Sequence, residues 1–152
     1  MSAGGLEAAA LQPEAYTFWT GADGDLWEAQ GKANGGLAAG VNRGMGPLGS
    51  APAAGVDDSG NTYVYWKGAD GNLWDGYWNG AKWVGPYNRG MGQLGSQPAV
   101  AITPSTTALT WVFWKGTDGN LWEGYWNGAK WVGPYDRGMG QLGSQPTVAI
   151  YH

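Results

Sequence analysis

Tryptophan and carboxylate side chains are the residues of this sequence whose types and spacing could do chemistry. The 152 residues include 11 Trp and no Cys, and the only His is the last residue, His152. This composition excludes thiolate nucleophiles, Cys-ligated metals, Ser-His-Asp triads and most His-based metal sites. What remains is the pairing of a flat aromatic face with fixed polar groups, which suits the C–H face and the hydroxyls of a sugar.

Charge and hydropathy exclude further classes of partner. Only 13% of the residues are charged, the net charge is -4, and the eight Lys and Arg are scattered, so we expect no nucleic acid partner. No apolar run approaches the roughly 18 residues of a membrane-spanning helix, so we expect no membrane insertion. Residues 1–15 lack the basic and strongly apolar parts of a signal peptide. Localisation stays open between the cytoplasm and release from the cell.

An internal repeat is the dominant feature of the chain. Segments that begin FWTGADGDLW, YWKGADGNLW and FWKGTDGNLW place Trp19, Trp66 and Trp114 at intervals of 47 and 48 residues. Residues 66–100 and 114–148 differ at only four positions, whereas the first copy is more divergent. We therefore divide the chain into an N-terminal extension, residues 1–15, and a three-repeat domain, residues 16–152, with repeats of about 16–61, 62–108 and 109–152.

Each repeat is predicted to form antiparallel strands. In the last copy, TWVFW (110–114) is rich in aromatic and β-branched residues, and an Asp-Gly turn separates it from LWEGYWN (121–127). Asn127-Gly128 predicts a type I′ hairpin before a third strand, AKWVGPY, and QPTVAI (145–150) is the fourth strand. Four short strands in about 47 residues match one blade of a β-propeller. The predicted fold class is all-β.

The order of the strands predicts self-association. The chain opens directly on a strand at Tyr16, and its last predicted strand has no later strand to pair with. Propellers hold about four to eight blades and this chain has three, so its sheet edges would stay open. We expect the ring to be completed by oligomerisation, most simply as a homodimer with six blades. The alternative is a single-chain β-trefoil, which the Gly-rich run after the hairpins disfavours.

The segment VFWKGTDGNLWEGYWNGAKWVGPY resembles two groups of propeller repeats. One is the bacterial lectin-like repeat of the Photorhabdus lectin type, with its G-T-D-G-x-L-W core. The other is the repeat of the fucose-binding propeller lectins of the Ralstonia and Aleuria type. The resemblance covers about residues 16–152 and implies a lectin, some members of which assemble rings from several chains.

The resemblance also implies where sugars bind. The Ralstonia-type pattern surrounds each sugar with a carboxylate from one blade and two tryptophans from the next. By this similarity Glu28 faces Trp78 and Trp83, and Asp75 faces Trp126 and Trp131. Glu123 would face the first repeat of another chain, which has neither tryptophan. The first-strand arginine of the fucose pattern is replaced by Thr17, Val64 and Val112, and the alternative donors are Arg43, Arg89 and Arg137.

Structural roles compete with these binding roles. The tryptophans present in all three copies are expected to fill the core between blades: Trp19, Trp66, Trp114, Trp27, Trp74 and Trp122. The aspartates of the Asp-Gly turn are expected to be turn residues, with calcium ligation as the alternative: Asp23, Asp70 and Asp118. The three arginines either tie a loop to a carboxylate or to carbonyls of the next blade, or contact a ligand.

The sequence predicts a multivalent lectin with no catalysis, no cofactor and no metal. Glu28, Asp75 and Glu123 occur once per repeat at one structural position, whereas a glycosidase needs two carboxylates within about 5–10 Å. The expected partners are glycans or monosaccharides, with weak single sites combined by multivalency. The alternatives are a structural or protein-interaction propeller, and a polysaccharide-anchoring module of a larger secreted enzyme.

Overall fold

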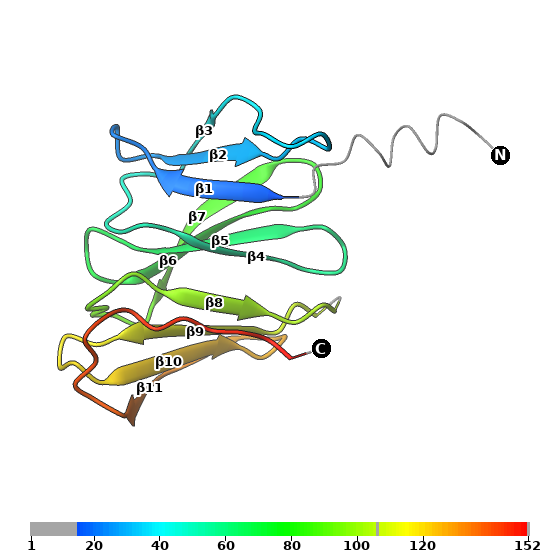
Figure 1. The fold of residues 1–152 in the computed structure, drawn as a ribbon. Coiled ribbons are helices and arrows are strands. Elements are labelled where there is room, and N and C mark those ends of the chain that lie inside the picture. The colour runs from blue at the N-terminus through cyan, green and yellow to red at the C-terminus, as the bar shows by residue number, and fades with distance from the viewer. Residues whose placement is uncertain (1–14, 106, 152) are drawn as a thin grey trace.

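Three antiparallel sheets lie one above another in the computed structural model, which describes residues 15–105 and 107–151 (Figure 1). Blade 1 has the strand order β1-β2-β3, blade 2 β4-β5-β6-β7, and blade 3 β11-β10-β9-β8. The strands are β1 (Tyr16–Thr20), β2 (Leu26–Gln30), β3 (Val41–Gly44), β4 (Ala53–Val56), β5 (Thr62–Lys67), β6 (Leu73–Trp78), β7 (Trp83–Gly90), β8 (Ala99–Ile102), β9 (Thr110–Lys115), β10 (Leu121–Trp126) and β11 (Trp131–Gly138). The predicted all-β, bladed architecture is confirmed, and a β-trefoil is excluded because the strands form three separate antiparallel sheets. The described residues contain no helix with the length and apolar character needed to cross a bilayer.

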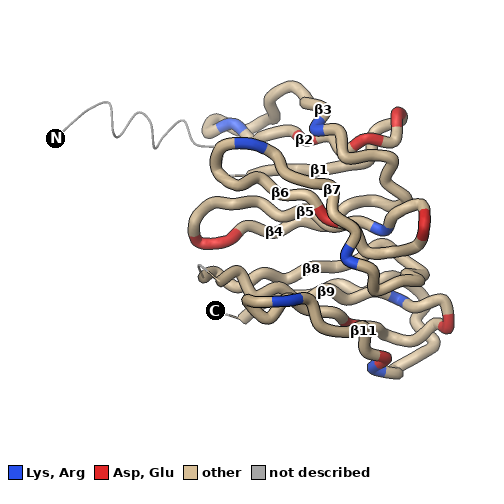
Figure 2. The backbone as a smooth tube through the Cα atoms, turned by 180° about the vertical axis from the view of Figure 1, so that it is seen from behind, with Lys and Arg blue, Asp and Glu red and all other residues tan. Residues whose placement is uncertain are grey.

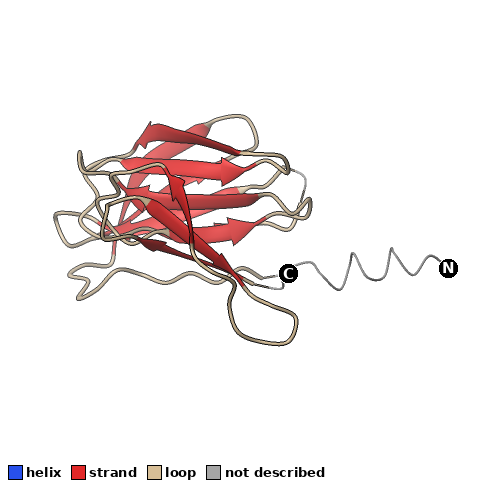
Figure 3. Cartoon of the chain, turned by 90° about the horizontal axis from the view of Figure 1, so that it is seen from above, coloured by secondary structure: helices blue, strands red, loops and turns tan. Residues whose placement is uncertain are grey.

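The inner strand of a blade comes from the end of the preceding repeat. β4 pairs with β5, and β8 pairs with β9, each across a short connection. The predicted strand at residues 145–150 is wrong for the isolated chain, because this segment has no regular secondary structure. A strand requires a neighbour for its backbone groups, and within the described residues no blade lies beyond the third. Figure 3 shows the C-terminal segment as a loop that runs beside the strands.

The second hairpin also differs from its prediction. β10 and β11 are joined by four residues, 127–130, in place of a two-residue type I′ turn. Gly128 takes a positive φ of 96°, while the side chain of Asn127 accepts hydrogen bonds from the amides of Ala129 and Lys130, both at 2.9 Å. The asparagine therefore acts through its side chain, as in an Asx turn, and not through a left-handed backbone.

The aspartates of the first hairpin are turn residues, as predicted. In blade 3, Asp118 Oδ1 accepts the amide of Asn120 at 2.9 Å and the indole Nε1–H of Trp122 at 3.0 Å. Asp70 holds Trp74 in the same way, with a 2.9 Å indole bond, and Asp23 holds Trp27 at 3.0 Å. The hydrogen bonds to the indole and to the backbone also lower the pKa of the exposed carboxyl groups of Asp70 and Asp118.

Replacing Asp118 with Ala should lower the stability of the fold, because the hydrogen bonds from the amide of Asn120 and the indole of Trp122 to the carboxylate are lost. The change should appear in chemical denaturation followed by intrinsic fluorescence. Ligand binding should not change in the two grooves described below, because Asp118 does not line either of them. A loss of affinity without a loss of stability would contradict the turn role.

Two hydrophobic clusters between adjacent blades form the core. One is built around Trp66 and the other around Trp114, each 1% exposed. The predicted core role is confirmed for these two tryptophans. It is wrong for Trp19, which occupies the same repeat position but is 37% exposed, because no blade precedes blade 1 in the described chain. The hairpin tryptophans Trp27, Trp74 and Trp122 are half-buried.

Candidate functional site

Each blade carries one carboxylate on the strand before its outermost strand. Glu28 lies on β2, Asp75 on β6 and Glu123 on β10. Glu28 and Asp75 are 3% and 2% exposed, whereas Glu123 lies in the last blade with a 14% exposed side chain. A buried carboxylate must be paired or hydrogen-bonded to remain charged, so its neighbours decide what it can do.

A β-bulge on the outermost strand aims an arginine at this carboxylate. On β7, Asn88 and Gly90 occupy successive positions of the ladder with β6, so Arg89 is the extra residue between them. Asn88 Oδ1 accepts the amide of Gly90 at 2.8 Å, and Gly90 takes a φ of 73°, which glycine adopts readily. Arg89 Nε then donates to Asp75 Oδ1 at 3.0 Å. Bulges commonly redirect a side chain in this way.

The same pair recurs in all three blades. Arg43 Nε donates to Glu28 Oε2 at 2.7 Å, and Arg137 Nε donates to Glu123 Oε2 at 2.7 Å. Each arginine thus contacts a carboxylate, as predicted, but the carboxylate belongs to its own blade and not to the next one. Among the described residues these guanidinium groups make no other hydrogen bond. A guanidinium has five N–H donors, so four remain for a ligand. Figure 2 shows the charged residues spread over all three blades.

The first groove lies between blades 1 and 2 and has a volume of about 220 Å³. Blade 1 contributes Glu28 and Arg43, and blade 2 contributes Trp78 and Trp83. The two tryptophan rings lie 6.2 Å apart, tilted by 55°, and Arg43 Cζ lies 5.8 Å from the Trp83 ring centroid. Tyr16, Gln30 and Thr62 complete the lining. The structure thus brings together the residues that the resemblance assigned to this site.

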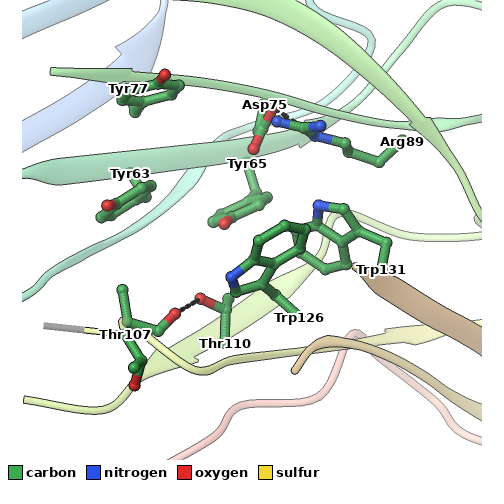
Figure 4. Close-up of a pocket in the computed structure, with 10 residues that line it drawn as sticks. Tyr63, Tyr65, Asp75, Tyr77, Arg89, Thr107, Thr110, Trp126 and Trp131 are labelled. Carbon is green, nitrogen blue, oxygen red and sulfur yellow. Dashed lines mark hydrogen bonds and ion pairs between the residues drawn. The ribbon is translucent and has the colours of Figure 1, made fainter. Parts of the chain in front are cut away.

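The second groove lies between blades 2 and 3 and has a volume of about 300 Å³. Figure 4 shows Asp75 and Arg89 across the cavity from Trp126 and Trp131. These two rings lie 6.1 Å apart, tilted by 53°, as in the first groove. Trp131 also meets Tyr65 edge to face at 5.8 Å. The carboxylate side chain of the second groove, Asp75, is one methylene shorter than Glu28 of the first groove, and the walls of the second groove contain more tyrosine.

Glu123 and Arg137 have no groove of this kind. A cavity of about 360 Å³ beside Glu123 is walled by Trp111, Phe113 and the C-terminal residues 148–151. The positions of the two groove tryptophans correspond in blade 1 to Gly31 and Leu37, which form an isolated bridge with each other. The structure therefore brings the predicted residues together in two sites, and no tryptophan pair from a following blade faces the third carboxylate within the described residues.

Several lining residues were missed by sequence reasoning. They are Tyr16, Gln30 and Thr62 in the first groove, and Tyr63, Tyr65, Tyr77, Thr107, Ala108 and Thr110 in the second. Strand alternation was the signal that could have found some of them. Tyr63 and Tyr65 are two residues apart on β5, and they lie opposite Tyr77 and Asp75 of β6. Residues paired in this way share one face of a sheet.

Hydrogen bonding of a ligand to Asp75 in the second groove should weaken as the pH falls. Burial raises the pKa of Asp75 to about 6 from its ordinary value of 3.8, although Arg89 opposes the shift. Protonation of this carboxyl removes the charge-assisted bond to Arg89, so affinity should drop as the pH falls through about 6. Ligand titrations at several pH values measure this drop in affinity. In the Asp75→Asn variant, the part of the pH dependence that arises from this carboxyl should be absent.

Stability should change in the opposite direction. The pKa of Asp75 is higher in the folded than in the unfolded state, so the ionised group destabilises the fold. Its unfavourable contribution is therefore relieved as the pH falls from about 6 toward 3.8. Denaturation of the wild type and of Asp75→Asn across this range separates the contribution of Asp75 from that of the other carboxyl groups. If Asp75 instead made the fold more stable as the pH rises, that result would contradict the assignment.

The chain has no match among family models and none among curated proteins. Its structure is similar to a fucose lectin from Kordia zhangzhouensis in complex with methyl-fucoside, with a TM-score of 0.59 and 23% identity over 80% of this chain and 90% of that one. It is also similar to a variant of the Aleuria aurantia lectin in complex with α-methyl-L-fucoside, with a TM-score of 0.61 and 18% identity over 80% of this chain and 38% of that one. The same lectin in complex with Fucα1-6GlcNAc gives a TM-score of 0.61 at 18% identity, covering 80% and 39%. These likenesses show that the chain has the fold of the propeller lectins.

Proposed function

We propose that this protein is a lectin that binds glycans in its first and second grooves and has no catalytic activity. One observation carries the proposal. Twice in the chain, a buried carboxylate held by an arginine faces a pair of tryptophans from the next blade. Repetition of one arrangement suits repeated binding, whereas a glycosidase needs two carboxylates in one site.

The groups in each groove complement a monosaccharide. The carboxylate accepts hydrogen bonds from sugar hydroxyls, and the terminal N–H groups of the arginine donate to hydroxyl oxygens. The tilted tryptophans offer apolar faces to the C–H groups of the ring. α-L-Fucosides are the first ligands to test, because the similar lectins were solved in complex with fucosides.

A glycan array with labelled protein, followed by calorimetric titration of α-methyl-L-fucoside, tests the proposal. We expect saturable binding to a coherent set of glycans, competed by a free monosaccharide, with two aromatic sites per chain. Galactose and mannose in the same titration distinguish a lectin of another specificity. No glycan binding at high micromolar protein would overturn the proposal and favour a structural or protein-interaction role.

We also propose that the chains self-associate, most simply as a homodimer with six blades. Both ends of the stack expose side chains whose counterparts in the other blades are covered. Trp19 is 37% exposed against 1% for Trp66, and Met139 is 80% exposed whereas Met45 and Met91 pack on the next blade. Several grooves in one assembly would raise the avidity for clustered glycans.

A further inference from the structure

The two junctions inside the chain are built from the same backbone contacts. At the first, Leu48 bridges to Gly68, and Gly49 N–H donates to the carbonyl of Lys67 at 2.8 Å. Lys67 N–H in turn donates to Ser50 Oγ at 3.0 Å. The second junction repeats all three contacts, with a Leu94–Gly116 bridge and bonds of 2.8 Å from Gly95 to Lys115 and 3.0 Å from Lys115 to Ser96.

After these contacts the chain enters the next blade as its inner strand. Ala53 to Val56 then pair with Tyr65 to Thr62, and Ala99 to Ile102 pair with Phe113 to Thr110. A Leu-Gly-Ser sequence followed by a short strand is thus the unit that attaches one blade to the next. The chain contains a third copy of this unit at residues 142–150, LGSQPTVAI.

The third copy has no blade to attach to within the described residues. It contains no strand, and its last residues lie near Trp111, Phe113 and Glu123 of the same blade. At the other end of the stack, the described part of blade 1 has three strands. No described strand pairs with the edge of β1 that faces away from β2, which is where the other blades have their inner strand. A cavity of about 460 Å³ lies along β1, between Tyr16 and Phe18 on one side and Ala54 to Val56 of β4 on the other. The attachment unit and the open edge are therefore complementary.

We infer that residues 142–150 of one chain form the missing inner strand of blade 1 in a second copy of this chain. The inference deepens the self-association proposed above and rests on it. Transfer of the register from the two internal junctions pairs Thr147 with Phe18, Val148 with Thr17, and Ala149 with Tyr16. Leu142 takes its place beside Gly21, as Leu48 and Leu94 do beside Gly68 and Gly116.

This docking also changes the surroundings of Glu123. Residues 148–151 leave the cavity that they share with Glu123, and blade 1 of the second copy takes their place as the facing wall. That wall carries Gly31 and Leu37 where the other grooves have tryptophans. The third groove is therefore incomplete without a second copy, and its apolar wall is aliphatic.

Disulfide trapping tests the register, because the chain has no cysteine of its own. A variant with Thr17→Cys and Val148→Cys should form disulfides between chains on mild oxidation, visible on a non-reducing gel. The matched control carries Thr17→Cys and Ala149→Cys. Its one-residue offset places the two thiols on opposite faces of the strand pair, so it should cross-link far less.

Native mass spectrometry of the unoxidised proteins separates this inference from the proposal on which it rests. Oligomers with an in-register disulfide support both. If the protein forms oligomers but the control pair cross-links as well as the in-register pair, or if neither pair of cysteines cross-links, the strand docking is overturned and self-association is not. Monomers at every concentration overturn both, while glycan binding is decided by the separate titration. Deletion of residues 145–152 should give monomers that keep the first and second grooves.

Discussion

Glycan binding should fall by about two orders of magnitude when Glu28 is replaced with Gln and Asp75 with Asn in the same chain. Each carboxylate is buried and receives the Nε–H of an arginine. The amides keep the shape of the side chains but lose the charge that orients the arginine and accepts hydrogen bonds from sugar hydroxyls. The loss should appear in titrations with whichever glycan the array identifies.

Glu123→Gln is the matched control for this double variant. It changes the same repeat position and also removes the charge partner of an arginine. No tryptophan pair faces Glu123 in the isolated chain, so glycan affinity should change little. Circular dichroism and intrinsic fluorescence establish that all variants are folded. Equal losses in the control and in the double variant would contradict the assignment of the two aromatic grooves.

Trp66→Ala should lower the free energy of unfolding by about 3–5 kcal/mol, because a large buried side chain is deleted. The Trp66 ring lies in the cluster that joins blades 1 and 2, with Leu26, Leu48 and Val64 as its buried neighbours. Urea denaturation, read as a shift in the midpoint at constant slope, measures the effect.

Trp19→Ala is the corresponding change at an open end of the stack. Trp19 occupies the same repeat position as Trp66, but it is 37% exposed whereas Trp66 is 1% exposed. In dilute protein, where chains are separate, the loss of stability should be much smaller than for Trp66→Ala. At high concentration Trp19→Ala should instead weaken self-association, as measured by sedimentation. An equal cost of the two changes in dilute protein would contradict the open end.

The repeat made much of the fold predictable. The spacing of Trp19, Trp66 and Trp114 gave the number of blades, and the composition of the segments between turn residues gave the strands. The turn role of Asp118 could also be predicted, because its side chain acts within four residues. The site was predictable in part, since the resemblance assigned the tryptophans of one blade to the carboxylate of the previous one.

Other features depend on partners that are distant in sequence. The arginine–carboxylate pair requires a bulge between Asn88 and Gly90, and a bulge is a property of the register between two strands. The strand predicted at 145–150 has the right composition but no neighbouring sheet. Trp19 carries the residue type of a core position, and its exposure follows only from its place at the end of the stack.

The equivalence of the two internal junctions constrains how many chains an assembly can contain. One rotation relates each blade to the next, and a junction of the same kind between chains continues that rotation. The blades return to the start only when a whole number of such steps completes a full turn, and otherwise they wind into an open helix. Since each chain adds three blades, a closed ring can contain only a multiple of three blades. Gly55 of β4 lies directly against Ile102 of β8, so a larger side chain at residue 55 would change the rotation between blades 2 and 3, and with it the second groove that lies between them.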